Sequence, residues 1–165
     1  MSGPADALEE GMARTLRTIG FAMGMGLALL SAVSIFLYAR SLSVVPTPQS
    51  VKFINMLTIL SAAYAFGAIV VSEILWKKML GGAVAADVNA KTQLAFIIRA
   101  ATREGAALLG GVTFFLACSD GVLRAYPAYW IDLAPTVLFW SFLYLHWPSL
   151  ENLKSELEEL LPKTP

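Results

Sequence analysis

Four long apolar runs, separated by short polar segments, set the pattern of the chain. The first, residues 19–39, contains no charged residue, and the others occupy about residues 53–76, 94–118 and 125–147. A helix needs about 20 predominantly apolar residues to cross the roughly 30 Å hydrocarbon core of a bilayer. The pattern therefore predicts an all-α protein in which residues 19–148 form an integral membrane four-helix bundle.

Polar segments with amphipathic spacing flank this predicted membrane domain. Residues 1–18 predict a cytoplasmic leader with a short interfacial helix, whose apolar face is formed by Leu8, Met12 and Leu16. Residues 149–165 predict a cytoplasmic amphipathic tail capped by Ser149, with an apolar face formed by Leu150, Leu153, Leu157 and Leu160. That face can pack against the protein's own cytoplasmic surface or dock to a partner, and the sequence favours neither.

The composition strengthens the prediction of a membrane protein, and the distribution of basic residues predicts its orientation in the membrane. The chain is 57% hydrophobic and 15% charged, whereas soluble domains are nearer 45–50% apolar and about 25% charged. With four spans, nine of the twelve Lys and Arg residues fall on the side that holds both termini. Because basic residues concentrate on the cytoplasmic side, we expect a multi-pass protein of the inner or plasma membrane with both termini cytoplasmic.

The same composition argues against several classes of function. Twelve basic residues balance twelve acidic ones, so no nucleic-acid-binding footprint is present. A single cysteine, Cys118, and a single histidine, His146, are too few for a zinc site built from cysteine or histidine ligands. No catalytic or phosphate-binding motif occurs. We therefore expect no metal, no cofactor and no enzymatic activity.

A small group of ionisable residues interrupts the apolar runs at one predicted depth. The predicted topology brings them near the cytoplasmic ends of spans two, three and four; they are Glu73, Arg99, Arg103, Glu104 and His146. Arg99 and Arg103 are four residues apart and share a helix face, so a carboxylate between them would relieve their repulsion, and Glu73 is the expected partner. The group is either a structural ion-pair network or part of a path for a proton, an ion or a small anion.

One further acidic residue, Asp132, interrupts the fourth span about two turns from its outer end. Arg124 and Asp120 lie close to it in the sequence. We expect Asp132 to be solvated or paired at the outer interface. Pro135, three residues later, is expected to bend or delay the span.

Small residues recur at helical spacing in two of the predicted spans. Gly20, Gly24 and Ala28 follow one another at intervals of four, and Gly110 and Gly111 interrupt the third span. Such stripes let a second helix backbone approach closely. They predict helix packing inside the bundle or, alternatively, the contact surface of a homo-oligomer.

Residues 99–115 resemble the ion-carrying helix of the proteolipid c-subunits of rotary ATPases. The matching segment is REGAALLG, from Arg103 to Gly110, in which a carboxylate precedes small residues. The resemblance implies that Glu104 carries a proton or a sodium ion and that the four spans correspond to a duplicated proteolipid. The chain departs from that family by placing Glu104 near one end of an odd-numbered span, beside Arg103.

These features lead to two hypotheses for the function. The first is a small non-enzymatic polytopic protein that acts as a subunit or scaffold of a membrane complex through helix packing. The alternative is an oligomer that translocates a proton, an ion or a small anion through the charged group. Both hypotheses name the lipid bilayer as a partner, together with further copies of the chain or other membrane subunits.

Overall fold

The computed structural model describes residues 5, 8–40, 44–84 and 86–160, and every regular element in them is a helix. In chain order these are α1 (Glu10–Arg40), α2 (Pro48–Leu80), α3 (Val88–Ser119), α4 (Val122–Ala125), the 3₁₀ helix η2 (Pro127–Leu133), α5 (Ala134–Leu145) and α6 (Leu150–Leu160). The prediction of an all-α protein is confirmed. Three segments of the described chain are long and apolar enough to cross a membrane, namely α1, α2 and the continuous stretch Pro127–Leu145.

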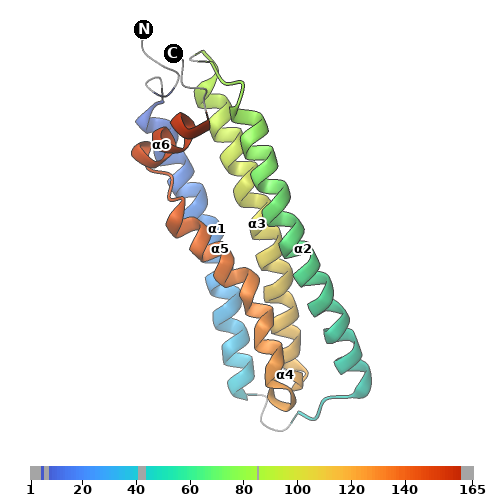
Figure 1. Cartoon of the computed structure of the whole chain (residues 1–165). Coiled ribbons are helices and arrows are strands. Elements are labelled where there is room, and N and C mark those ends of the chain that lie inside the picture. Colours follow the sequence, from blue (N-terminus) through green and yellow to red (C-terminus); the bar gives the residue numbers. More distant parts are fainter. Residues whose placement is uncertain (1–4, 6–7, 41–43, 85, 161–165) are drawn as a thin grey trace.

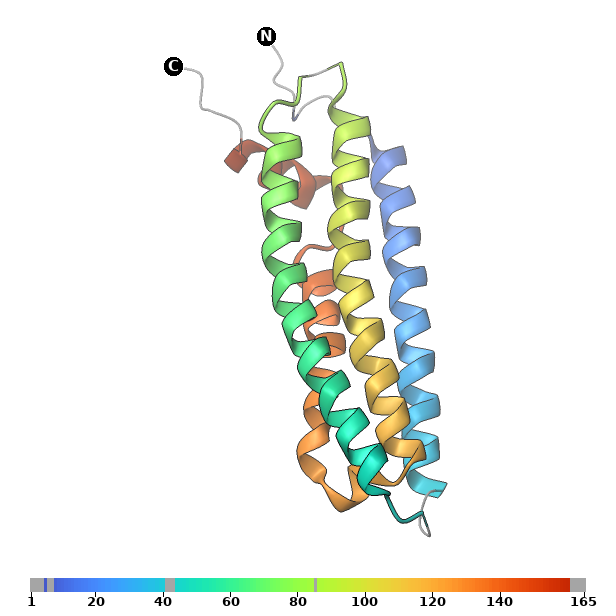
Figure 2. The same cartoon turned by 90° about the vertical axis from the view of Figure 1, so that its right-hand side faces the viewer.

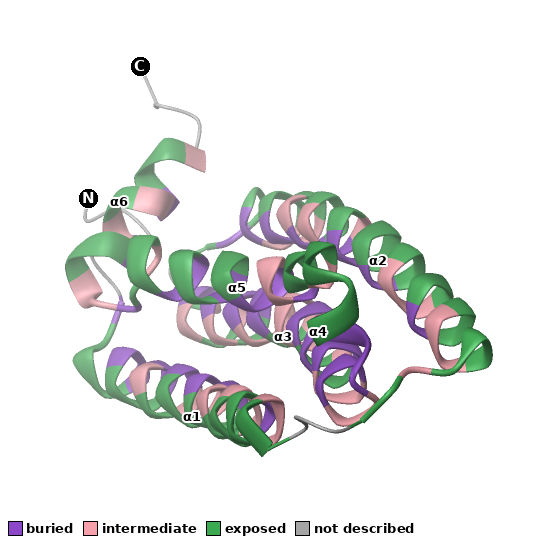
Figure 3. Cartoon of the chain, turned by 90° about the horizontal axis from the view of Figure 1, so that it is seen from below, coloured by how far each residue is buried: buried purple, intermediate pink, exposed green. Residues whose placement is uncertain are grey.

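Helix α3 occupies the centre of the structure. It packs along α1, α2 and α5, whereas α2 and α5 touch each other only sparingly. Figure 2 shows α3 lying between α1 and α2, and the end-on view of Figure 3 shows buried residues concentrated on α3. Helix α3 has 32 residues, close to the 31 of α1 and the 33 of α2, and it carries Arg99, Arg103 and Glu104 near its middle. The helix with three charged residues near its middle is therefore the one that its neighbours cover best.

The first helix is longer than the sequence predicted. Instead of a short interfacial helix followed by a span at residues 19–39, α1 runs without a break from Glu10 to Arg40. No proline interrupts this stretch, so nothing ends the helix between the predicted leader and the predicted span. The expected apolar face does form, because Leu8, Met12 and Leu16 are all buried in the core. Residues 1–4 and 6–7 of the predicted leader lie outside the described residues.

The fourth apolar run also differs from the single helix predicted at residues 125–147. It consists of η2 followed by α5, with Pro127 and Pro135 each in the first turn of its helix. Proline is tolerated there because the first turn needs no backbone N–H donor. As expected from Pro135, the α-helix of this run begins late, at Ala134, and η2 carries Asp132 into a buried position.

Close contacts at glycine explain how α3 and α1 receive their neighbours. A Cβ atom on Gly110 would lie 2.7 Å from the carbonyl oxygen of Asp132, and one on Gly24 would lie 2.8 Å from the ring of Trp140. Gly111 faces Leu30 in the same way, and Gly20 faces Leu143. Ala28 is half-buried. The predicted small-residue positions thus include four glycines that support packing within one chain.

Substituting Gly110 tests this packing. In Gly110→Ala the new methyl group meets the backbone of η2, which cannot move aside cheaply, so we expect a loss of about 1–3 kcal/mol in the free energy of unfolding. Gly67→Ala on α2 is the matched control, because no atom lies within 4 Å of its Cβ position. Denaturant titration in a mild detergent measures both variants. Equal stability of the two would contradict the tight approach of η2 to α3.

Candidate functional site

Five ionisable side chains from four segments come together, at the end of the bundle where α6 lies (Figure 1). Helix α2 supplies Glu73, α3 supplies Arg99 and Arg103, and α6 supplies Glu156, while His146 caps the end of α5. Salt bridges and hydrogen bonds join all five. We call this set the charged network.

Arg99 is the centre of the charged network. Its Nε and Nη2 atoms donate to Glu73 Oε1 at 2.9 and 2.7 Å, and its Nη1 donates to Glu156 Oε2 at 2.9 Å. Arg103 binds the same oxygen of Glu73, and its Nε donates to Ser72 Oγ at 3.1 Å. Glu73 therefore lies between the two arginines, as the spacing of Arg99 and Arg103 predicted.

Aromatic rings complete the surroundings of both guanidinium groups. The Arg99 guanidinium lies 4.9 Å from the ring centre of Trp76 and 5.2 Å from that of Phe142. The Arg103 guanidinium lies 4.3 Å from the centre of the Phe142 ring. Arginine stacks favourably on such rings when it is desolvated. The side chain of Arg99 is only 4% exposed, so its charge is compensated by two carboxylates and two rings instead of by water.

Helix α6 is held against the bundle by polar and apolar contacts together. His146 Nδ1 lies 2.8 Å from Glu156 Oε1. Leu153 and Leu157 are buried in the core that also contains Leu16, and the Ser149 hydroxyl accepts a hydrogen bond from the backbone N–H of Asn152. The predicted cap is confirmed, and the apolar face of the tail packs against the protein's own bundle. Residues 161–165 of the predicted tail lie outside the described residues.

The pKa of Glu156 makes the attachment of α6 depend on pH. Burial by itself would raise the pKa of this carboxyl, but the hydrogen bond to His146 and the charge of Arg99 outweigh burial and lower it below its ordinary value. A carboxyl with a lowered pKa in the folded state stabilises that state above its ordinary pKa. The contribution is lost as the pH falls through the lowered value, so acid weakens the attachment of α6.

The charged network contains four of the five residues that the sequence predicted, and one that it did not. Glu73, Arg99, Arg103 and His146 come together, whereas no hydrogen bond or ion pair joins Glu104 to another described residue. Glu156 was not predicted. Its position between Leu153 and Leu157 was the available signal, because a residue beside the buried stripe of an amphipathic helix faces the protein at its edge.

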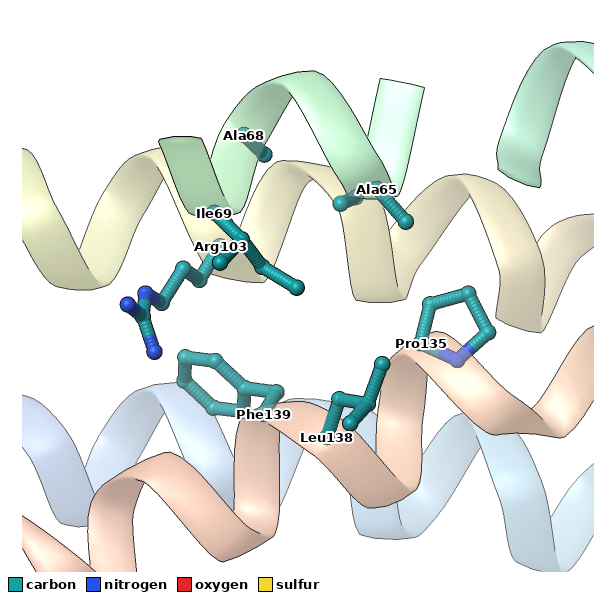
Figure 4. Close-up of a pocket in the computed structure, with 8 residues that line it drawn as sticks. Ala65, Ala68, Ile69, Arg103, Pro135, Leu138 and Phe139 are labelled. Carbon is teal, nitrogen blue, oxygen red and sulfur yellow. The ribbon is translucent and has the colours of Figure 1, made fainter. Parts of the chain in front are cut away.

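A laterally open groove lies between α2 and α5, where these helices separate. Its larger part is a cavity of about 290 Å³ between α2 on one side and η2 and α5 on the other. A smaller cavity of about 60 Å³ shares four lining residues with it and ends at Arg103. Figure 4 shows Arg103 of α3 at one end of this smaller cavity and Pro135 of α5 at the other. We call the two cavities together the α2–α5 groove.

Asp132 lines the larger part of the α2–α5 groove. The expectation that it is solvated or paired at the outer interface is wrong, because the residue is only 2% exposed and no described basic side chain pairs with it. Its Oδ2 atom lies 3.1 Å from Thr58 Oγ1. The 3₁₀ helix turns Asp132 inward, and Gly110 leaves room for its backbone. The signal in the sequence was an acidic residue inside an apolar run, which is a functional candidate by default.

A double-mutant cycle tests the charged network. Glu73→Ala removes the carboxylate that separates two arginines, and we expect a loss of about 3 kcal/mol in the free energy of unfolding because buried charge is left uncompensated. Arg103→Ala in the Glu73→Ala background should cost less than in the wild type. Denaturant titration in detergent measures the cycle, with Glu151→Ala on the exposed face of α6 as the control. Additive effects of the two substitutions would contradict the pairing.

Comparisons of the chain with models of protein families, with curated proteins and with solved structures found no match. They leave the resemblance of residues 99–115 to rotary ATPase proteolipids as a prediction. Within the described part of the chain, no set of three or more His, Cys, Asp or Glu side chains lies close enough together to hold a metal ion. Two features therefore remain as candidate sites, the charged network and the α2–α5 groove.

Proposed function

We propose that the chain is a multi-pass protein of the inner or plasma membrane that crosses the bilayer four times, with both termini in the cytoplasm. The outward faces of α1 and α2 support this placement, since large apolar side chains such as Leu29 and Phe66 are 68% and 73% exposed. Large apolar side chains exposed to this extent suit a lipid environment. The excess of basic residues on the side of the termini supports the orientation.

In this proposal α3 crosses the membrane in addition to the three apolar segments, although three charged residues lower its hydropathy. Two of these, Arg99 and Arg103, meet carboxylates and aromatic rings near the cytoplasmic end, as expected of charged residues in a membrane segment. The remainder of α3, from Gly105 to Cys118, is apolar or small. Its neighbours cover it on three sides, so few of its polar groups would meet lipid.

We infer that the protein acts as a non-enzymatic subunit or scaffold of a membrane complex. The observation that carries this inference is the closure of the charged network, in which every charge is compensated within the chain and α6 is fastened across the cytoplasmic end. Such a network suits a rigid structural unit better than a site that must bind and release an ion. The apolar outer faces of α1 and α2 then remain available for lipid and for neighbouring subunits.

The alternative function is translocation by an oligomer, and Glu104 is the observation that favours it. This carboxylate is half-exposed on α3 and has no hydrogen-bond or ion-pair partner among the described residues. An intramembrane carboxylate without a partner can exchange a proton or bind an ion. In this alternative Glu104 is the carrier, and Glu73, Arg99, Arg103 and His146 hold the helices in place around it.

Reporter fusions test the membrane placement. Alkaline phosphatase fused after Val45 in the α1–α2 connection should be active, because we expect that connection outside the cytoplasm. The same reporter fused after Leu160 should be inactive, and a fluorescent protein fused there should fold and fluoresce. Activity of both phosphatase fusions, or of neither, would mean that the two positions lie on the same side of the membrane, and the four-span topology would be lost.

Purification of the protein at its native expression level distinguishes the subunit function from translocation. We expect the tagged protein, extracted in a mild detergent from its own membrane, to migrate in a defined complex containing other polypeptides in fixed stoichiometry. Mass spectrometry of the excised complex measures the composition. A homo-oligomer alone would contradict the subunit proposal, and ion flux through that oligomer in liposomes, abolished by Glu104→Gln, would establish translocation instead.

A further inference from the structure

We propose that the α2–α5 groove is a binding site for a small amphiphilic amine, with its ammonium group at Asp132 and its apolar chain along α2 and α5. The inference uses the membrane placement proposed above but is independent of the subunit function. It rests on the polar groups at one end of the groove and on the apolar walls of the rest.

The first step is the unbalanced charge at Asp132. This carboxyl group is almost fully buried, and its one hydrogen-bond partner among the described residues is Thr58. The Thr58 hydroxyl has a single proton but lies 3.0 Å from Ile54 O and 3.1 Å from Asp132 Oδ2. The hydroxyl can share its proton between these two acceptors, so Asp132 receives one shared donor and no opposite charge. A buried carboxylate with so little compensation needs either a proton of its own or a cation.

The second step is a polar group without a partner beside Asp132 in the lining of the same cavity. Ser61 is 1% exposed, and its Oγ atom has no hydrogen-bond partner among the described residues. An unpaired buried hydroxyl costs free energy that a ligand can recover by hydrogen bonding. An ammonium group has three donors, enough to reach the carboxylate and the half-buried hydroxyl of Thr58 together, while Ser61 would have to rotate its hydroxyl toward the groove to join them.

The third step is the character of the walls. Apart from Thr58, Ser61 and Asp132, the larger cavity is lined by alanine, proline and large apolar side chains, which suit an alkyl chain. No other titratable group lines this part. Arg103 stands at the far end, in the smaller cavity, and is paired with Glu73. The groove thus combines one carboxyl group that no described basic side chain neutralises with apolar walls, a pattern complementary to an amphiphilic cation.

The depth of Asp132 decides between a free amine and the ammonium group of a phospholipid. Its carbonyl oxygen lies against Gly110, nine residues before α3 ends at Ser119. Nine residues span about 13 Å along a helix axis. A phospholipid headgroup stays at the membrane surface, whereas a single-chain amine can bring its nitrogen to this depth when a carboxylate receives it. We therefore assign the site to a free amphiphilic amine.

Binding exchanges one cation for another at Asp132. The carboxyl group releases its proton to solvent, and the resulting carboxylate pairs with the ammonium group, so the charge in the site remains zero. Protons and amine then compete for the same oxygen atoms. Acidification must therefore weaken binding.

Equilibrium dialysis with labelled octylammonium tests the proposal. The full chain is reconstituted in phosphatidylcholine nanodiscs, and empty nanodiscs correct for partitioning into lipid. We expect one saturable site per chain that weakens as the pH falls. Asp132→Asn should reduce its affinity by about tenfold or more, because a hydrogen-bonded charge pair is lost. Ala62→Phe, at an exposed position of the lining, should block the groove. Asp120→Asn, outside the groove, should bind as the wild type does.

Three results would overturn the proposal. One is saturable binding that Asp132→Asn leaves unchanged while size-exclusion and circular dichroism show the variant to be folded. Another is equal binding of neutral 1-octanol with the same dependence on Ala62→Phe, since the groove would then accept any alkyl chain. The third is loss of octylammonium binding in nanodiscs that contain phosphatidylethanolamine, which would identify the occupant as a phospholipid. Reporter fusions that place Val45 and Leu160 on one side would overturn the four-span topology, whereas this assay measures only binding at Asp132.

Discussion

The compensation of one buried guanidinium is the constraint on which the end of the bundle beside α6 depends. Arg99 lies on the central helix and is almost fully removed from solvent. A charge in that position is tolerated only with close counter-charges and hydrogen bonds. Glu73 and Glu156 supply them from helices 26 and 57 residues away in the sequence. The ends of α2, α3 and α6 are consequently fixed to one another at a single point.

The central position of α3 explains where the helices pack tightly and why the α2–α5 groove stays open. Glycines on α3 and α1 admit η2, α5 and the side chains of their neighbours at short range. Helix α5 packs chiefly on α3, and its Phe142 lies against both arginines. Helix α2 packs chiefly on α3, so a gap remains between α2 and α5. The α2–α5 groove therefore results from α2 and α5 each packing mainly on α3.

Two kinds of ionisable group can be distinguished by their partners. The charged network is closed, since each of its members has an opposite charge or a hydrogen bond within the chain, and closure favours a structural function. Asp132 and Glu104 have no opposite charge among the described residues. Ionisable groups that lie in an apolar segment without such a counter-charge are the better candidates for binding a proton, a cation or an amine.

The sequence by itself determined the helical class and the apolar runs, because these depend on local periodicity. It also indicated that Glu73 pairs with the arginines, because Arg99 and Arg103 share a helix face four residues apart and few carboxylates interrupt the apolar runs. It could also indicate that α6 is amphipathic, but not which surface would cover its leucines. Only the tertiary structure decided that Glu156, not Glu104, completes the surroundings of Arg99, since that choice depends on how α6 folds back. The burial of Asp132 was likewise decided by packing, because it requires a 3₁₀ turn and the absence of a side chain at Gly110 on another helix. Long-range contacts of this kind leave no periodic signal in a single chain.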